Sequence, residues 1–243
     1  MTDRGTLFLV PTPIGNLSDM TFRAVTILKE VDLIACEDTR TSSVLFSHYG
    51  ITTPKTSFHL HNEHRKTPVL IKKLNMGTSI ALITDAGTPG ISDPGFLLVR
   101  AGVAAGIRIE SLPGPSAVIP ALTASGLPAD RFVFEGFLPN KKGRLKKLRA
   151  LANEDRTMIF FESPHRLYKL LQQMERVFGP KRQAVVCREI SKKFESYHRG
   201  SLTELKEWAS GKDRVKGEIV VVLAGIGYAA PQSADDLQPT SED

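Results

Sequence analysis

The chain has 243 residues, of which 41% are hydrophobic and 24% charged, as in a globular protein of one large or two small domains. Its formal charge is +6, and residues 226–243 hold four acids and no Lys or Arg, so the body before them is more basic still. A basic body favours an anionic partner, with plain solubility as the alternative. No apolar run is long enough for a membrane span or a signal peptide, which predicts a cytoplasmic location. Cys36 and Cys187 lie in apolar runs and are expected to be buried thiols.

Short apolar runs alternate with helical patterns in the first half of the chain, which indicates an α/β fold. We expect strands at 6–10, 33–36, 79–84 and 107–112, and helices at 21–30, 39–49 and 96–105. Asp38 is placed to cap the second of these helices. The continuous apolar run at 79–84 is typical of a buried parallel strand. The pattern predicts an N-terminal domain at 1–113, with ligands bound outside the carboxyl ends of its strands.

A second α/β domain is predicted at 131–225, after a linking segment at 114–130 that contains a short helix. Its expected strands are 132–135, 157–161, 183–187 and 218–223, and its helices are 144–151, 165–178 and 203–209. Periodicity leaves the direction of these strands open. Ser163 before Pro164 predicts a helix start with a side-chain cap. Residues 226–243 are predicted to form a disordered acidic tail.

The segment from Thr84 to Gly95, TDAGTPGISDPG, is the most informative loop. Three glycines and two prolines make it stiff and poor in side chains, so that a ligand can approach its backbone. Asp85 can accept hydrogen bonds from a hydroxyl or an ammonium group. Asp93 precedes Pro94 and is expected to cap the next helix. Because the loop follows a buried strand, ligand binding is favoured over a plain turn.

Two further loops follow strands, at PTPIGN from Pro11 and at PGPSA from Pro113. Ser116 in the latter either caps the next helix or faces a ligand. Neither the dinucleotide pattern G-x-G-x-x-G nor the phosphate loop G-x-x-x-x-G-K-[ST] occurs in the chain. Nucleotide-dependent redox and ATP chemistry therefore lose support.

Six segments in one order resemble the tetrapyrrole methylase superfamily: PTPIGNLSDMT, CEDTR, TDAGTPGISDPG, PGPSA, FESPHR and REISKKFE. The resemblance runs from about Leu7 to Gly225. Within the superfamily, the chain is similar to the branch that 2′-O-methylates a cytidine ribose in the decoding centre of 16S ribosomal RNA. It lacks the glycine-rich first loop and the Gly-Asp-Pro motif of the members that modify tetrapyrroles, which argues against such a substrate. The implied fold is two α/β domains with the cofactor cleft between them.

The resemblance implies S-adenosylmethionine as the cofactor and a homodimer as the assembly. Positions that match the cofactor contacts of the family in the first domain are Pro13, Ile14, Asp85, Gly87, Thr88, Ile91, Ser116 and Ala117. In the second domain they are Phe161, Arg188 and Gly217. Small and apolar groups of this kind suit a cleft that leaves the donor methyl poorly hydrated.

The segment CEDTR follows the second predicted strand and is the best candidate for the acceptor side. Glu37 can orient a ribose hydroxyl or take its proton, and Arg40 can clamp a phosphate, so both are predicted catalytic residues. The structural alternative is a helix cap from Asp38 and an ion pair between Glu37 and Arg40.

The segment HLHNEH, residues 59–64, contains three histidines. His59 and His61 would share a face of a strand, but no further ligand follows at a recognisable spacing, so no metal is predicted. Contact of His61 and Asn62 with RNA is the preferred interpretation, and a plain helix cap is the alternative for Asn62.

The segment 140–149 holds six basic residues and no acid, and a second basic cluster spans 188–199. Two basic patches favour RNA over a small substrate, although a solvated helix face is the usual alternative. The predicted RNA-binding residues are His61, Asn62, Lys141, Lys142, Arg144, Lys146, Lys147 and Lys192. The expected partner is 16S ribosomal RNA or the small ribosomal subunit, without a membrane.

The predicted reaction is in-line displacement, in which the ribose oxygen attacks the donor methyl and alignment supplies roughly 7–11 kcal/mol. Two alternatives remain. A methyltransferase of the same fold acting on a tetrapyrrole or a protein would not need the basic stretch. A non-catalytic ribosome-binding module would have no affinity for the cofactor.

Overall fold

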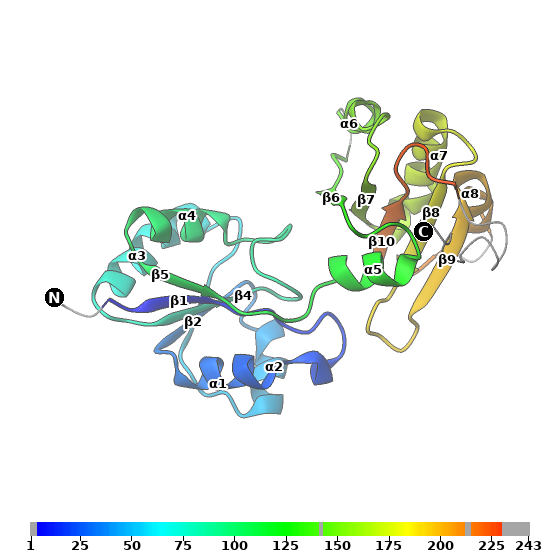
Figure 1. The fold of residues 1–243 in the computed structure, drawn as a ribbon. Coiled ribbons are helices and arrows are strands. Elements are labelled where there is room, and N and C mark those ends of the chain that lie inside the picture. Colours follow the sequence, from blue (N-terminus) through cyan, green and yellow to red (C-terminus); the bar gives the residue numbers. More distant parts are fainter. Residues whose placement is uncertain (1–3, 141–142, 212–214, 230–243) are drawn as a thin grey trace, which may run out of the picture. The chain divides into compact units, whose positions relative to one another are not determined.

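The computed structural model describes residues 4–140, 143–211 and 215–229. These residues form two compact units (Figure 1): those within 1–117 together with 191–193, and those within 118–190 together with the described residues from 194 onward. Each unit has its own sheet and its own core. No helix in the described ranges is both long and apolar enough to cross a membrane.

The first unit is built on a parallel five-stranded sheet with the order β3-β2-β4-β1-β5. Its strands are β1 (Thr6–Leu9), β2 (Leu33–Cys36), β3 (Lys55–Ser57), β4 (Ile80–Ile83) and β5 (Arg108–Ser111). All four residues of the central strand β4 are buried, as its continuous apolar run requires in a sheet covered on both faces. Because the strands are parallel, their carboxyl ends lie at one edge, and the loops that leave this edge can meet.

Helices cover both faces of this sheet (Figure 1). Helices α1 (Phe22–Glu30) and α2 (Thr41–Tyr49) lie on one face, and α3 (Glu63–Asn75) and α4 (Phe96–Ala104) on the other. The faces have separate cores: Leu28 and Phe46 belong to one with Ile83, and Leu70 and Leu98 to the other with Leu82. A short 3₁₀ turn (Leu17–Asp19) precedes α1.

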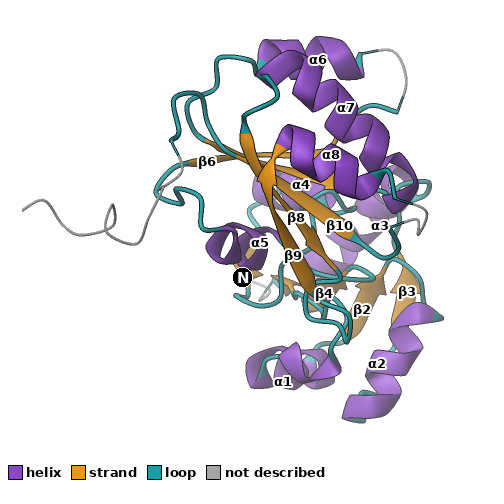
Figure 2. Cartoon of the chain, turned by 90° about the vertical axis from the view of Figure 1, so that its right-hand side faces the viewer, coloured by secondary structure: helices purple, strands orange, loops and turns teal. Residues whose placement is uncertain are grey.

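The second unit has a mixed sheet with the order β6-β7-β10-β8-β9. It contains α5 (Val118–Ser125), β6 (Phe132–Phe137), α6 (Arg144–Ala150), β7 (Thr157–Glu162), a 3₁₀ turn (Pro164–Arg166), α7 (Leu167–Phe178), β8 (Gln183–Arg188), β9 (Ser196–Ser201), α8 (Leu202–Ala209) and β10 (Ile219–Leu223). Strands β6 and β7 are parallel and the other pairs antiparallel. Helices α6, α7 and α8 share one core with the sheet. Figure 2 shows α7 and α8 lying over the strands of this sheet.

All of the predicted strands and helices are present, with ends that differ by at most two residues. The boundary between the units lies at 117/118, and α5, which was predicted within a linking segment, packs against β8, β9 and β10. Two strands and one α-helix were not predicted, namely β3, β9 and α3, and neither was the 3₁₀ turn at Leu17–Asp19. Strand β3 has only three residues and β9 has six that are mostly polar, so neither shows the apolar run of a buried strand. Helix α3 contains Pro68, a residue that normally ends a helix. The predicted tail from residue 230 onward lies outside the described residues.

Cys36 and Cys187 are free and buried, as predicted. The predictions that Asp38 and Ser163 cap helices are wrong in detail. The Ser163 side chain makes no capping hydrogen bond, although Pro164 does occupy the first position of a 3₁₀ turn. Residue Arg40 precedes α2, and the Asp38 side chain accepts a hydrogen bond from its backbone N–H at 2.8 Å. Asp38 therefore shapes the turn before the helix instead of capping its first turn.

Candidate active site

Hydrogen bonds join the three predicted ligand loops at the carboxyl edge of the first sheet. Thr12 and Gly87 form an isolated antiparallel bridge, in which each backbone N–H donates to the other residue's carbonyl at 2.9 Å. The Thr12 hydroxyl also donates to the Thr84 carbonyl at 3.0 Å. The Thr88 hydroxyl donates to the Pro115 carbonyl at 3.1 Å, which ties in the third loop. The loops therefore form one connected structure.

Glycine is required where these loops approach one another. A Cβ atom on Gly114 would lie 2.9 Å from Cβ of Pro11, closer than normal packing allows. Gly87 has a φ of +80°, a left-handed conformation that side chains disfavour, and it lies within the bridge. The edge thus presents backbone and short side chains, with Ile91 as an exposed apolar side chain at 42% of its full exposure.

Two acidic residues follow neighbouring strands and are joined through their backbones. Glu37 comes directly after β2, and Asp85 comes two residues after β4. The Asp85 carboxylate accepts the backbone N–H of Asp38 at 3.1 Å, and the Glu37 carboxylate accepts the backbone N–H of Asp85 at 3.4 Å. These reciprocal bonds fix both carboxylates at the same edge of the sheet.

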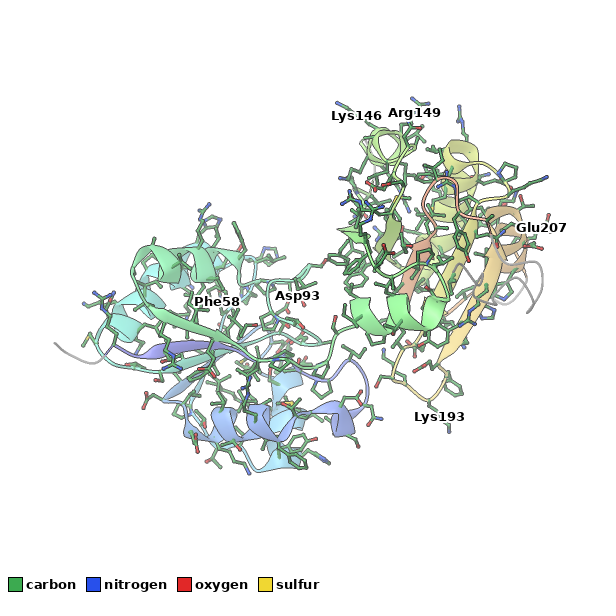
Figure 3. All side chains as sticks on the ribbon, viewed as in Figure 1. Phe58, Asp93, Lys146, Arg149, Lys193 and Glu207 are labelled. Carbon is green, nitrogen blue, oxygen red and sulfur yellow. The ribbon has the colours of Figure 1, made fainter. Side chains whose placement is uncertain are left out.

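Asp93 is a third member of this carboxylate cluster, which we define as Glu37, Asp85 and Asp93. Figure 3 shows Asp93 at the end of the first unit that is far from the N-terminus. Burial raises its pKa to about 6, as do the nearby charges of Glu37 and Asp85, against a hydrogen bond from Thr84. The prediction that Asp93 caps α4 is wrong, because Gly95 precedes that helix and no side chain caps it.

The pKa values of the two other cluster members are also raised. Burial is the main cause for both Glu37 and Asp85. The negative charges of Asp85 and Asp38 raise the pKa of Glu37 further, and that of Asp38 raises the pKa of Asp85. Among the described residues, no ion pair with Lys or Arg involves any of the three cluster members. Carboxyl groups held near one another without a compensating charge are typical of functional sites, since folding alone does not favour them.

Arg40 lies beside the cluster but pairs with Asp38. Its Nη2 is 2.9 Å and its Nε 3.2 Å from the Asp38 carboxylate, while 90% of the arginine side chain stays exposed. This guanidinium lowers the pKa of Asp38 to about 2. The alternative ion pair between Glu37 and Arg40 is not formed. Within the part of the chain that the structure describes, the Glu37 carboxylate therefore keeps only its contacts within the carboxylate cluster.

The loop after β3 places His61 and Asn62 in different environments. His61 is exposed, as RNA contact would require. Asn62 is buried, and its amide bonds to the backbone N–H and the ring of His59 and to Ser57. It neither caps α3 with its side chain nor faces solvent, so its prediction as an RNA-binding residue is wrong.

The predicted cofactor residues of the second unit come together at one end of its sheet. Arg188 ends β8 opposite Ile219, the first residue of β10, and Phe161 lies opposite Val220, the second. Gly217 comes two residues before the start of β10. The Arg188 guanidinium bonds to the Ser196 hydroxyl and the Lys216 carbonyl at 3.1 and 3.3 Å. The Phe161 ring packs edge-on against Phe134 and Phe137.

The basic stretch divides into buried and exposed parts. Arg144 is only 3% exposed and forms a salt bridge with buried Glu162, so its prediction as an RNA-binding residue is wrong. Lys146 and Arg149 project outward from α6 (Figure 3). Lys147 is half-exposed and pairs with Glu135 at 2.8 Å. Lys141 and Lys142 lie outside the described residues, and Lys192 is in the turn between β8 and β9.

Comparison with known proteins identifies the family. Residues 6–206 match the model of the tetrapyrrole (corrin/porphyrin) methylases. The chain belongs to the tetrapyrrole methylase family. A protein of Pseudomonas aeruginosa named ribosomal RNA small subunit methyltransferase I is 52% identical over 235 residues, which cover 96% of this chain and 83% of that protein. The protein of the same name from Haemophilus influenzae is 52% identical over 228 residues, covering 93% and 81%.

Solved structures of the tetrapyrrole methylase fold agree with the two-sheet architecture. A diphthine synthase has a TM-score of 0.70 at 14% identity, with 90% of each chain covered. A uroporphyrin-III C-methyltransferase from Thermus thermophilus, complexed with S-adenosylhomocysteine, has a TM-score of 0.63 at 20% identity, with 90% of this chain and 97% of that chain covered. At such identities these structures bear on the fold alone.

Proposed function

We propose that this tetrapyrrole methylase family member transfers a methyl group from S-adenosylmethionine to the 2′-hydroxyl of a cytidine ribose in the decoding centre of 16S ribosomal RNA. The observation that carries the proposal is the identity of about half of all residues, over nearly the whole chain, with proteins named ribosomal RNA small subunit methyltransferase I. The site geometry of the first unit is consistent with this chemistry. Its edge combines close-packed glycine loops with carboxylates that have raised pKa values.

The loops of the first unit fit the proposed cofactor. In the bridge, the backbone groups of Thr12 and Gly87 bond to each other. The short residues next to them in the two loops can therefore contact a ligand. Exposed Ile91 offers an apolar surface for a purine ring, and the Asp85 carboxylate can accept from a hydroxyl or an ammonium group. We propose the cofactor contacts at Pro13, Ile14, Asp85, Gly87, Thr88, Ile91, Ser116 and Ala117, with Phe161, Arg188 and Gly217 from the second unit.

In the proposed mechanism, the bound donor supplies a methyl group activated by the positive charge on its sulfur. Glu37 accepts the proton of the ribose hydroxyl, and its raised pKa brings this carboxylate closer to the basicity that proton transfer near neutral pH requires. Arg40 keeps an exposed guanidinium next to Glu37 and can bind an RNA phosphate. Alignment of the hydroxyl by these two residues is the chain's main contribution to the rate.

RNA binding is proposed for the exposed part of α6 and for the loops near the site. Lys146 and Arg149 present positive charge without a neighbouring acid in the helix. Lys147, whose ammonium group pairs with Glu135, is the third residue of α6 that we propose as an RNA contact. A tetrapyrrole-modifying enzyme of the same fold has no need of this basic face, which is why we favour RNA. His61 and Lys192 are proposed as further RNA contacts.

The assembly is proposed to be a cytoplasmic homodimer. Apolar side chains that a monomer leaves exposed on α3 and α4, such as Val69 and Val103, are available for a contact between copies. Sedimentation equilibrium tests this part separately. A monomer at all concentrations would contradict it without affecting the reaction.

The test of the function is mass mapping of ribose methylation in small-subunit RNA. RNA from cells with and without the gene is compared, and small subunits lacking the modification are then incubated with purified protein and the methyl donor. We expect one cytidine in the decoding centre to lose its methyl group in the deletion strain and to regain it in vitro. An unchanged methylation map would contradict the proposal.

A further inference from the structure

Asn62 fixes the position of the proton on the His59 ring. The Asn62 Oδ1 accepts the backbone N–H of His59 at 3.0 Å, so the amide nitrogen is the atom that faces the ring. This Nδ2 lies 3.0 Å from His59 Nε2 and also reaches the Ser57 hydroxyl at 3.3 Å. An amide nitrogen only donates, so Nε2 must accept from it. The neutral imidazole then carries its proton on Nδ1.

The Nδ1 atom of His59 is buried and has no hydrogen-bond partner among the described residues. A buried N–H without an acceptor costs free energy, so folding alone does not explain why Asn62 maintains it. Hydrogen bonds of catalytic groups are often long in a free enzyme and shorten when the substrate binds. An unused donor beside the cluster therefore suggests a role in the reaction.

Glu37 is the acidic residue on the neighbouring strand end. Strands β2 and β3 pair Cys36 with Ser57, and the backbone N–H of Phe58 donates to the Cys36 carbonyl at 2.8 Å. Glu37 and His59 therefore leave adjacent strands at the same edge of the sheet. The positive charge that the ring carries when both nitrogens are protonated is close enough to lower the pKa of Glu37, against the larger effect of burial.

We propose that His59 is a positioning residue for Glu37: its Nδ1–H donates to the Glu37 carboxylate and orients it toward the ribose hydroxyl. This inference rests on the proposed function, because it assigns to Glu37 the role of proton acceptor. During the reaction the bond from the ribose oxygen to the methyl carbon forms as the carbon–sulfur bond breaks. The hydroxyl proton goes to Glu37, and His59 keeps its own proton throughout.

Other charged groups face this pair and set the background for its titration. Asp38 and Asp85 lie beside Glu37, and Asp93 faces it from the loop after β4. The His61 ring centroid lies 6.0 Å from that of His59. These groups are unchanged in the variants below, so differences between the variants report on the His59 donor.

Three variants separate the two ring nitrogens. His59→Asn keeps an amide donor near the place of Nδ1, whereas His59→Gln places its amide near Nε2. Asn62→Asp has nearly the same shape but accepts where the amide donates, which moves the ring proton to Nε2. His48→Asn, an exposed residue in the last turn of α2, is the matched control.

The first measurement uses the free protein and needs no substrate. Nitrogen-15 NMR of the ring is expected to show His59 protonated on Nδ1 in the wild type and on Nε2 in Asn62→Asp. Carbon-13 NMR of the Glu37 carboxyl is expected to give a higher titration midpoint in His59→Gln than in His59→Asn. A wild-type ring protonated on Nε2, or equal midpoints in the two variants, would overturn the proposal.

The second measurement is single-turnover methyl transfer to small subunits across pH. We expect His59→Gln and Asn62→Asp to lower the maximal rate by about 10–100-fold. His59→Asn should retain more of the rate, with cofactor affinity by calorimetry unchanged in all three. Equal rates in the two His59 variants would overturn the positioning role. If the wild type methylates no small subunit, the proposed function fails, and the NMR results still decide the contact between His59 and Glu37.

Discussion

Both units have carboxylates at or just after the ends of buried strands, but the surroundings of these carboxylates are opposite in the two units. In the second unit, Glu162 ends β7 at 4% exposure, bonded to buried Arg144 and, at 2.7 Å, to Nε of Arg166. In the first unit, Glu37 and Asp85 follow β2 and β4 with only backbone N–H groups as donors among the hydrogen bonds of the described residues. A buried carboxylate that is paired with cations has a structural role, whereas carboxylates that repel one another without a paired cation are typical of a functional site.

The largest effect on stability is expected from removing the compensated acid. Glu162→Ala leaves Arg144 buried without its partner, and burial already lowers the pKa of this guanidinium despite Glu162. We expect the free energy of unfolding to fall by about 3–5 kcal/mol, measured by urea denaturation. The double variant Glu162→Leu, Arg144→Met is the control and should recover most of the loss. A loss below about 1 kcal/mol in the single variant would show that the pair is not structural.

The opposite pattern is expected in the first unit: loss of activity without loss of stability. Asp85→Ala removes the acceptor for the Asp38 N–H and one member of the mutually repelling cluster. Methyl transfer should fall about 100-fold or more, since Asp85 is proposed to hold the methyl donor and a misplacement of about 1 Å can cost this much. The midpoint of thermal unfolding should stay the same or rise. Asp85→Asn keeps an acceptor oxygen and should lose less. Unchanged turnover in Asp85→Ala would exclude the residue from the site.

The same contrast explains which parts of the molecule the sequence could predict. The apolar strands and the loops after them follow from local patterns, and so does the position of Asp85. Asp93 was assigned to a helix start, because its contact with Thr84 and Glu37 depends on how the loop folds back over the edge. Arg144 has the sequence pattern of an exposed basic helix, and its burial depends on a glutamate 18 residues further along the chain. The role of His59 was hidden because β3 is too short and polar to be recognised as a strand.

Asp93 provides a test of the unpaired cluster through the pH dependence of stability. Its pKa in the folded protein is about 6, above the ordinary value of 3.8, so the folded state binds this proton more tightly. The stabilisation from this proton is complete below about pH 4 and is lost as the pH rises through about 6. Asp93→Asn should therefore be more stable than the wild type by about 1–2 kcal/mol at pH 7 and equal to it near pH 4.

Chemical denaturation at several pH values between 4 and 8 measures this difference. The matched control is Asp130→Asn, an exposed acid of the second unit outside the cluster, which should give no such pH-dependent gain. If Asp93→Asn is destabilised at pH 7, then Asp93 is held by compensating contacts like those of Glu162, and the contrast between the units fails.

Substitution of the exposed cations of α6 is expected to have the smallest effect on the free energy of unfolding and to leave the fold unchanged. Lys146 and Arg149 point outward, whereas Lys147 is paired with Glu135, so Lys146→Glu with Arg149→Glu is the variant to compare. If both contact RNA phosphates, the slope of log affinity against log salt should weaken by about 1.5. Lys181→Glu makes the same kind of charge reversal on an exposed turn before β8 and should change the slope far less. An equal change in both would mean that the second unit attracts RNA only through its total charge.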